Sequence, residues 1–187
     1  MKKLFFMLVC ALNFTILCAQ SVEKTYVYGI DYTYAKVYGA EESTEQFAKA
    51  FEGINMLIIK EPAKFDFSRV LGKEVEVIIE PIINIISSSD YSNLKSLNST
   101  YENPNYSEII KKYNLPQTEG IGVVLITKMM NKPQNKAYYE LITFNIATRE
   151  ILSQKEVNGK AGGFGLRNFW AGSIYSVIKS NKFKKKR

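Results

Sequence analysis

The clearest periodic pattern in the chain lies near its C-terminus. From residue 166 onward, apolar side chains recur at intervals of three and four residues, as they do on one face of an α-helix. The pattern predicts a helix over residues 166–179 whose apolar face belongs to the core. We therefore expect Trp170 to be buried. The face consists of Leu166, Phe169, Trp170, Ile174, Val177 and Ile178.

A second helix is expected from Ser43 to about residue 60. Ser43 and Gln46 have the spacing of a capping box, in which each side chain bonds the backbone of the other residue at a helix start. Pro62 ends the pattern, and Asp66 could start one further helical turn. The apolar positions of the longer helix are Phe47, Ala50, Phe51, Ile54, Leu57 and Ile58.

Two segments before residue 87 have the pattern of β-strands. Residues 26–38 alternate with a period of two, with a bend expected at Gly29. Residues 73–79 predict another strand, and the apolar run 82–86 follows Pro81. Because proline cannot donate to a strand ladder, we expect a sheet edge or a bulge at Pro81.

The second half of the chain predicts an antiparallel meander. Residues 87–116 are polar and loop-like, with room for short helices, and such an insertion is a reasonable place for a binding surface. Three strands then follow at 120–129, 137–145 and 151–157, separated by short turns. The order β-α-β-(short α)-β-β-β-α predicts one α/β (α+β) domain with a mixed β-sheet.

The first residues have the pattern of a secretory signal peptide. Lys2 and Lys3 precede an apolar run that continues to about Ala19. The alternative is a transmembrane anchor, but the run is short and ends in small residues. A lipoprotein acylated at Cys18 is a further alternative, although Leu17 stands where that pattern has a small residue. We expect export to the periplasm or the outer membrane.

Composition limits the chemistry of the mature chain. The 187 residues, 46% of them hydrophobic, provide material for one buried core. The domains predicted are a signal peptide at 1–19, a folded domain at 20–181 and a basic tail at 182–187. Both cysteines, Cys10 and Cys18, precede the folded domain, and the sequence has no histidine. We therefore expect no disulfide, no Cys–His or Ser–His–Asp catalysis, no zinc site and no cofactor.

The net charge of +7 belongs to the two ends of the chain. The lysines at positions 2 and 3 account for two charges and the C-terminal tail for five, so the chain between them is neutral overall. We therefore expect no nucleic-acid partner. The tail is expected to be solvated, with weak contact to an anionic membrane surface as the alternative. Its charges are Lys182, Lys184, Lys185, Lys186 and Arg187.

The tyrosines of the first strand are candidate binding residues. Tyr28, Tyr32 and Tyr34 occupy alternate positions that point to the same side of the predicted strand. Tyrosine rings suit sugar faces and protein interfaces. The alternative is that a helix covers the row. Asp31, which lies among small neighbours, is the candidate carboxylate of this region.

The glycine-rich loop before the last helix is a candidate anion site. Backbone amides of Gly162, Gly163 and Gly165 precede a helix start, where free N–H groups favour negative charge. The glycine spacing matches neither the phosphate-binding loop nor the dinucleotide fingerprint. The alternative is a flexible connection that lets the last helix dock.

No catalytic residue is assigned from the sequence. The Ser-x-x-Lys matches at Ser92 and Ser176 lack the accompanying Lys-Thr-Gly, and such short matches are expected by chance. An enzyme that acts on glycan or peptidoglycan through Asp31 and a second carboxylate is the alternative to a non-catalytic protein.

Residues 138–179, YYELITFNIATREILSQKEVNGKAGGFGLRNFWAGSIYSVIK, resemble the end of small envelope α/β domains. In such domains a meander strand, a turn, another strand and a tryptophan-bearing helix close the sheet. The order of elements is also distantly similar to the periplasmic TolB amino-terminal and penicillin-binding-protein activator lipoprotein type. The resemblance implies a non-catalytic binding or assembly module of the cell envelope, with an envelope protein or a glycan as partner. It assigns no functional residue.

Overall fold

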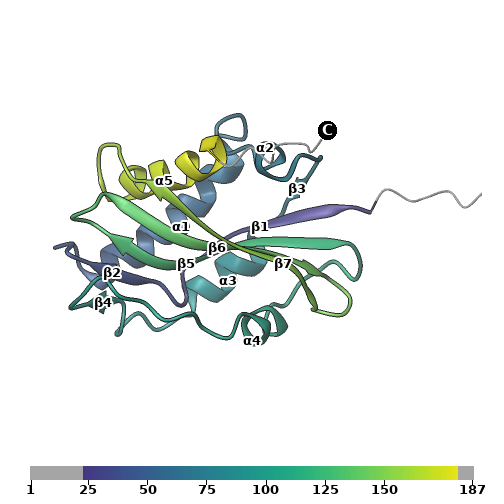
Figure 1. Ribbon diagram of the computed structural model, residues 1–187, viewed down its shortest axis with the longest axis horizontal. Helices are drawn as coiled ribbons and strands as arrows, with labels where there is room; N and C mark the ends of the chain where they lie inside the picture. The colour runs from purple at the N-terminus through teal and green to yellow at the C-terminus, as the bar shows by residue number, and fades with distance from the viewer. Residues whose placement is uncertain (1–22, 181–187) are drawn as a thin grey trace, which may run out of the picture.

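A mixed seven-stranded β-sheet forms the centre of the structure, a computed structural model that describes residues 23–180 (Figure 1). The predicted signal peptide and basic tail lie outside the described residues. The described chain forms one body with an α/β fold, as the sequence predicts. No helix within residues 23–180 is both long enough and apolar enough to span a bilayer.

The central strand is β5 (Ile121–Asn131), and it is paired along both edges. On one edge it pairs antiparallel with β6 (Lys136–Asn145), which pairs antiparallel with β7 (Ile151–Lys160). This is the predicted meander. On the other edge β5 pairs in parallel with β1 (Thr25–Asp31) and then with β2 (Lys36–Tyr38).

The first predicted strand is interrupted between β1 and β2. Asp31 Oδ1 accepts the N–H of Thr33 at 2.8 Å, and the N–H of Ala35 donates to Tyr32 O at 3.0 Å. These local bonds compete with the ladder and turn the chain out of the sheet over residues 32–35. The prediction of one continuous strand over residues 26–38 is therefore wrong.

A β-bulge at Gly29 reverses the alternation within β1. The register with β5 shifts between Val27 and Ile30, and Gly29 has a φ of +96°. Asn55 of α1 (Thr44–Lys60) bonds the displaced backbone, accepting from Ile30 N at 2.8 Å and donating to Ile30 O at 2.9 Å. A Cβ at Gly29 would collide with Asn55 Oδ1. Tyrosines on either side of the bulge therefore face opposite sides of the sheet.

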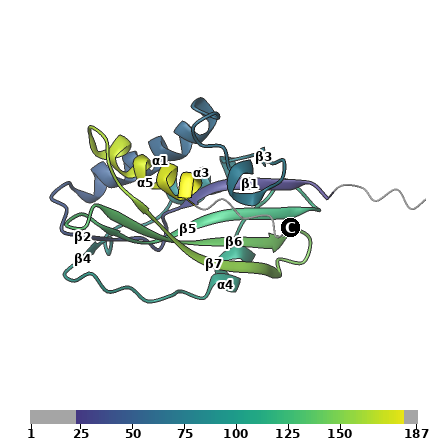
Figure 2. The ribbon, with the colours of Figure 1, turned by 45° about the horizontal axis from the view of Figure 1, so that its top comes forward.

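Two long helices cover one face of the sheet, and a short helix lies on the other (Figure 2). The long helices are α1 and α5 (Leu166–Ser180), and the short one is α4 (Tyr106–Lys111). The predicted capping box starts α1, with Gln46 N donating to Ser43 Oγ and Ser43 N donating to Gln46 Oε1. Trp170 of α5 is fully buried, as predicted.

The apolar run after Pro81 is a helix. Pro81 lies in the first turn of α3 (Glu80–Ser87), where its missing N–H costs nothing. Ile82 and Ile86, four residues apart, are both buried, and the helix packs beside α1 and β1. The sheet edge or bulge predicted at Pro81 is therefore wrong.

The other short elements lie at the borders of the sheet. Of the predicted strand 73–79, only β3 (Glu76–Val77) pairs, with β1, and β4 (Lys95–Ser96) pairs with β2. The helical turn expected near Asp66 is α2 (Ser68–Leu71), whose first N–H donates to Asp66 Oδ1 at 3.0 Å.

Candidate functional site

A buried lysine on the central strand is the starting point of the site. Lys128 is 2% exposed and lies in an irregularity of β5, where the register with β6 shifts between Thr127 and Met129. Its side chain lies on the α4 face of the sheet, among residues 101–106. A buried ammonium group is costly unless it is paired, so its partners define the site.

Two carboxylates and an amide bind Lys128. Its Nζ donates to Glu140 Oε2 at 3.1 Å, to Glu156 Oε2, and to Asn103 Oδ1 at 3.3 Å. Glu140 and Glu156 are directly paired neighbours on β6 and β7. Glu140 is buried, whereas the Glu156 side chain is 52% exposed. The Tyr101 ring completes the shell, with its centroid 5.0 Å from Nζ.

The network keeps the lysine charged. Burial works against its ammonium group, but hydrogen bonds to Glu156 and Glu140 outweigh burial, so the pKa of Lys128 lies above its ordinary value. The Tyr106 hydroxyl lies 3.4 Å from Glu140 Oε2, and burial raises the pKa of Tyr106 too. A protonated lysine is neither a nucleophile nor a general base, so these groups hold structure and charge.

An open pocket of about 510 Å³ borders Lys128. It lies beside the interruption between β1 and β2, and the segment before α4 forms its far wall. Both strands and this segment contribute aromatic rings and polar groups. The lining residues are Tyr34, Lys36, Ser96, Thr100, Tyr101, Glu102, Asn103, Pro104 and Lys128.

The charges around the pocket nearly cancel. The two negative charges of Glu140 and Glu156 exceed the single positive charge of Lys128, and the negative charge of Glu102 balances the positive charge of Lys36. Lys36 Nζ also donates to Asn93 O at 2.7 Å. The pocket therefore does not concentrate anions. Its tyrosine rings, hydroxyl groups and amide suit a ligand that is neutral, polar and flat on one side.

Asp31, the carboxylate singled out in the sequence, is enclosed in the fold. It is buried, and its Oδ2 accepts the Tyr113 hydroxyl at 2.6 Å while Oδ1 accepts Thr33 N. These bonds connect the end of β1 to the chain just after α4. Asp31 does not line the pocket described above, and its buried carboxylate is bonded within the fold.

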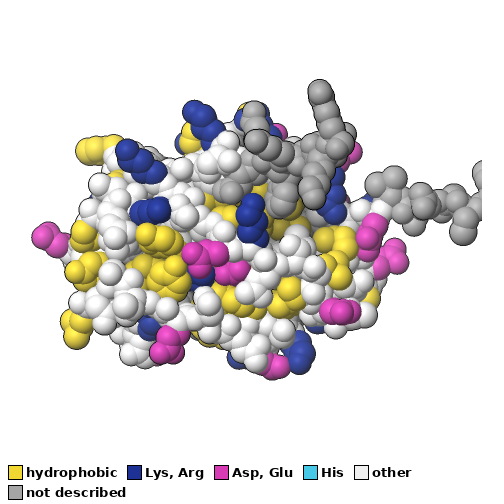
Figure 3. Space-filling model, in the orientation of Figure 1, with side chains coloured by type: hydrophobic (Ala, Val, Ile, Leu, Met, Phe, Trp, Pro, Cys, Tyr) yellow, Lys and Arg dark blue, Asp and Glu magenta, His cyan; other side chains and the backbone are white. Residues whose placement is uncertain are grey.

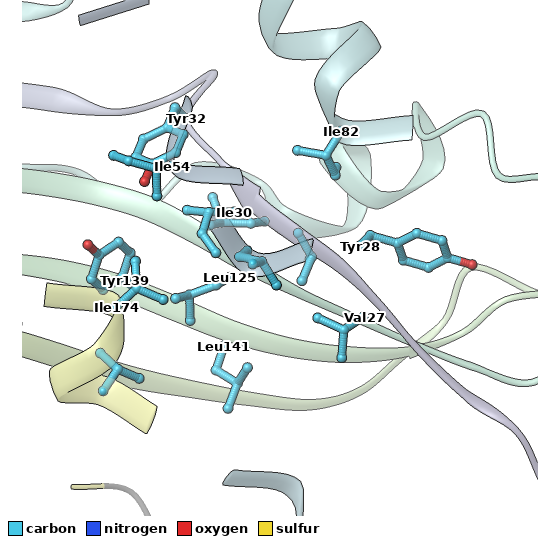
Figure 4. Close-up of a cluster of buried hydrophobic side chains, with 14 of the residues drawn as sticks. Val27, Tyr28, Ile30, Tyr32, Ile54, Ile82, Leu125, Tyr139, Leu141 and Ile174 are labelled. Atoms are coloured by element: carbon cyan, nitrogen blue, oxygen red, sulfur yellow. The ribbon is translucent and has the colours of Figure 1, made fainter. Parts of the chain in front are cut away.

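The expected tyrosine row is divided by the Gly29 bulge. Tyr28 and Tyr32 are fully buried and lie far apart in the core (Figure 4). Tyr28 donates its hydroxyl hydrogen to Gln117 Oε1 at 2.9 Å, whereas Tyr32 stacks on Phe51 of α1 at 4.0 Å between ring centroids. Tyr34, beyond the turn, is partly exposed and lines the pocket. Of the three candidate tyrosines, the structure brings Tyr34 alone to this site.

The glycine loop between β7 and α5 has the backbone that only glycine adopts easily. Gly163 and Gly165 have φ values of +130° and +77°. The amide of Gly162 donates to Phe169 O at 2.9 Å, and Phe169 N donates to Gly165 O at 2.9 Å. At least the Gly162 amide is thus used to attach the loop to α5.

Glycines also allow α5 to lie directly on the backbone of the preceding segment. A Cβ at Gly159 of β7 would collide with Ser173 O, and a Cβ at Gly172 would collide with Gly162 O. Ser173 itself bonds the Tyr139 hydroxyl of β6 at 2.5 Å. This close approach agrees with the second interpretation of the loop, a connection that docks the last helix.

The sequence contains a signal for Lys128 and Glu140 that periodicity alone does not show. Each is the single charged residue within a largely apolar stretch of strand, ITKMM in β5 and AYYELITF in β6. A charge at such a position must be paired in the fold. Within residues 23–180, no group of three or more carboxylate, cysteine or histidine side chains is arranged to hold a metal ion.

Comparisons of the chain with models of protein families, with curated proteins and with solved structures found no match.

Proposed function

We propose that this chain is a non-catalytic binding module of the cell envelope, and that the pocket beside Lys128 holds its ligand. The observation that carries the proposal is the open pocket of about 510 Å³, built on paired strands and lined by Tyr34 and Tyr101. Export is supported by the lysines and apolar run at the N-terminus. In the envelope, the pocket would meet glycans and exported proteins.

Binding is favoured over catalysis by the groups at the pocket. Hydrolysis of a glycosidic bond ordinarily needs two carboxylates on either side of the scissile bond. Glu102 is the one carboxylate among the lining residues, while Glu140 and Glu156 are engaged by Lys128. A protonated, fully paired lysine also offers no nucleophile.

The ligand class that best fits the pocket is a neutral saccharide. Sugar rings have one apolar face that stacks on tyrosine and a rim of hydroxyl groups that bond polar side chains. Tyr34 and Tyr101 would supply the stacking surfaces, and Ser96, Thr100 and Asn103 the polar contacts. An acidic ligand would meet the excess negative charge of Glu140 and Glu156.

The test is a titration with chitotetraose as a neutral probe and polygalacturonate as an acidic one. Changes in the amide signals of Tyr34, Tyr101 and Asn103 with chitotetraose, lost in Tyr101→Ala, would support the proposal. Tyr175→Ala is the control, because Tyr175 is a tyrosine with an exposed ring that lies on α5, outside the pocket. Signals unchanged by chitotetraose, or equal responses in both variants, would contradict the neutral-saccharide assignment.

A further inference from the structure

The tip of the β7–α5 loop presents an aromatic ring to solvent. Phe164 is 96% exposed, although phenylalanine is among the residues most often buried. The flanking Gly163 and Gly165 both have positive φ, so the backbone projects the ring away from the body. In Figure 3, hydrophobic atoms protrude at the corner where this loop lies in Figure 1.

Basic side chains surround this tip. Lys160 ends β7 and is the direct cross-strand neighbour of Lys136 on β6. Like charges in that arrangement repel each other. Lys132 lies in the adjoining β5–β6 turn, with its Nζ 3.4 Å from the centroid of the Phe169 ring, and Arg167 is exposed in the first turn of α5. None of these four cations forms an ion pair within residues 23–180.

The loop and the turn are physically joined. Ala161 N donates to Asn135 O at 2.7 Å, which connects the segment before Phe164 to the β5–β6 turn. Residues 132–136 and 159–168 together contain four basic residues and no acidic one. An acidic loop, residues 39–42, adjoins the turn on its β2 side, where Gly39 packs against Pro133. The Phe164 side of this end is therefore positively charged.

We propose that Phe164 and its basic surround form a peripheral contact for an anionic lipid surface. An aromatic side chain at the tip would enter the headgroup region, while lysine and arginine remain at the level of the lipid phosphates. A protein pocket that accepts Phe164 would need no ring of cations, whereas an anionic bilayer is complementary to both features. The proposal does not depend on what the pocket beside Lys128 binds.

Sedimentation with vesicles tests the contact, with the C-terminal tail kept in every variant so that its charge is constant. On phosphatidylglycerol vesicles, Phe164→Ser should weaken binding about tenfold, the loss expected when an apolar ring no longer leaves water. Lys132→Gln with Lys160→Gln should weaken it about fivefold for each charge removed. Leu152→Ser is the matched control, because Leu152 is a half-exposed apolar residue near the opposite end of β7.

Fluorescence locates the tip directly. Phe164→Trp, made with Trp170→Phe, should give an emission that shifts to shorter wavelength on phosphatidylglycerol vesicles and stays unchanged on phosphatidylcholine vesicles. Because Phe164 is exposed, Phe164→Ser should leave the thermal unfolding midpoint unchanged. Equal binding of Phe164→Ser and the unmodified protein would overturn the proposal. An emission unaffected by either vesicle would also overturn it, and would leave a protein partner as the occupant.

Discussion

Replacing Lys128 by methionine should lower the free energy of unfolding by about 3–5 kcal/mol, the usual cost of leaving a buried charge without its partner. The substitution keeps a long unbranched side chain and removes the ammonium group. Glu140 would then stay buried without its ammonium partner, with the Tyr106 hydroxyl 3.4 Å from its Oε2. An O–H···O bond of that length is weak.

The two glutamates provide an internal comparison, since both bind the same Nζ. Glu156 is half exposed, so Glu156→Gln should cost at most about 1 kcal/mol, as for other solvated ion pairs. Glu140 is buried, and Glu140→Gln should cost about 1.5–3 kcal/mol, the range for a hydrogen bond to a charged group. The expected order of destabilisation is therefore Lys128→Met, then Glu140→Gln, then Glu156→Gln.

Urea unfolding followed by circular dichroism measures these losses of stability. A double variant shows whether they arise from an unpaired buried charge. Lys128→Met with Glu140→Leu removes both buried charges of this site, so it should be more stable than Lys128→Met alone. A cost for Lys128→Met below about 1 kcal/mol, the level of a surface ion pair, would refute the buried network. The network would also be refuted if the destabilisation of the double variant equalled the sum of those of Lys128→Met and Glu140→Leu, each made alone.

Four further features of the fold give measurable expectations. Trp170→Ala should cost about 3–5 kcal/mol as a large core truncation, measured by urea unfolding, and a loss well below that would place α5 on the surface. Gly159→Ala should cost about 1–3 kcal/mol, because a Cβ forces α5 away from Ser173; an unchanged denaturation midpoint would contradict this packing. Asn55→Leu should cost about 1–3 kcal/mol for each backbone group of Ile30 that it leaves without a partner, and a neutral result would mean that water replaces the amide. Stability should also fall as pH rises above about 10, the ordinary tyrosine pKa, because buried tyrosines stay protonated in the folded state while unfolded ones ionise. The slope is up to about 1.4 kcal/mol per pH unit for each such tyrosine, and a flat profile of stability above that pH would contradict the burial of Tyr28, Tyr32, Tyr113 and Tyr139.

A local sequence pattern was sufficient to predict a helix or strand where the residues that make up the pattern also form that helix or strand. The capping box at Ser43 and Gln46 marks the start of α1, and the spacing of apolar residues around Trp170 marks α5. Strands β5 and β6 are equally clear, since each is a long and largely apolar segment between turns. The third meander strand, β7, is mostly exposed and is marked by the turns around it. The patterns of these elements owe little to distant residues.

The apolar run 82–86 shows where a local pattern is ambiguous. A short run of isoleucines fits a buried strand and a buried helix equally well by periodicity. Pro81 carried the deciding information, because proline is favoured in the first turn of a helix and disfavoured inside a sheet. In the structure it lies in the first turn of α3.

The candidate site could not be assembled from the sequence, because distant residues determine it. The alternation of the β1 tyrosines fails at the Gly29 bulge, where Asn55 bonds the backbone of Ile30 from 25 positions further along the chain. The pocket combines Tyr34, Tyr101 and Lys128, which come from the turn after β1, the loop before α4 and the central strand. The order of apolar and polar positions along the chain does not show which distant residues come into contact.

The contacts of Lys128 also give a reason for keeping a charge where an apolar side chain would cost less. Its Nζ bonds Asn103 and lies over the Tyr101 ring, and both residues belong to the pocket wall. Since the wall has little regular structure of its own, these contacts attach it to the sheet. Lys128→Met with Glu140→Leu should therefore separate the two roles. The double variant should recover global stability, while amide hydrogen exchange over residues 97–105 becomes faster and chitotetraose binding is lost. Unchanged exchange in that segment would mean that the wall is held without Lys128.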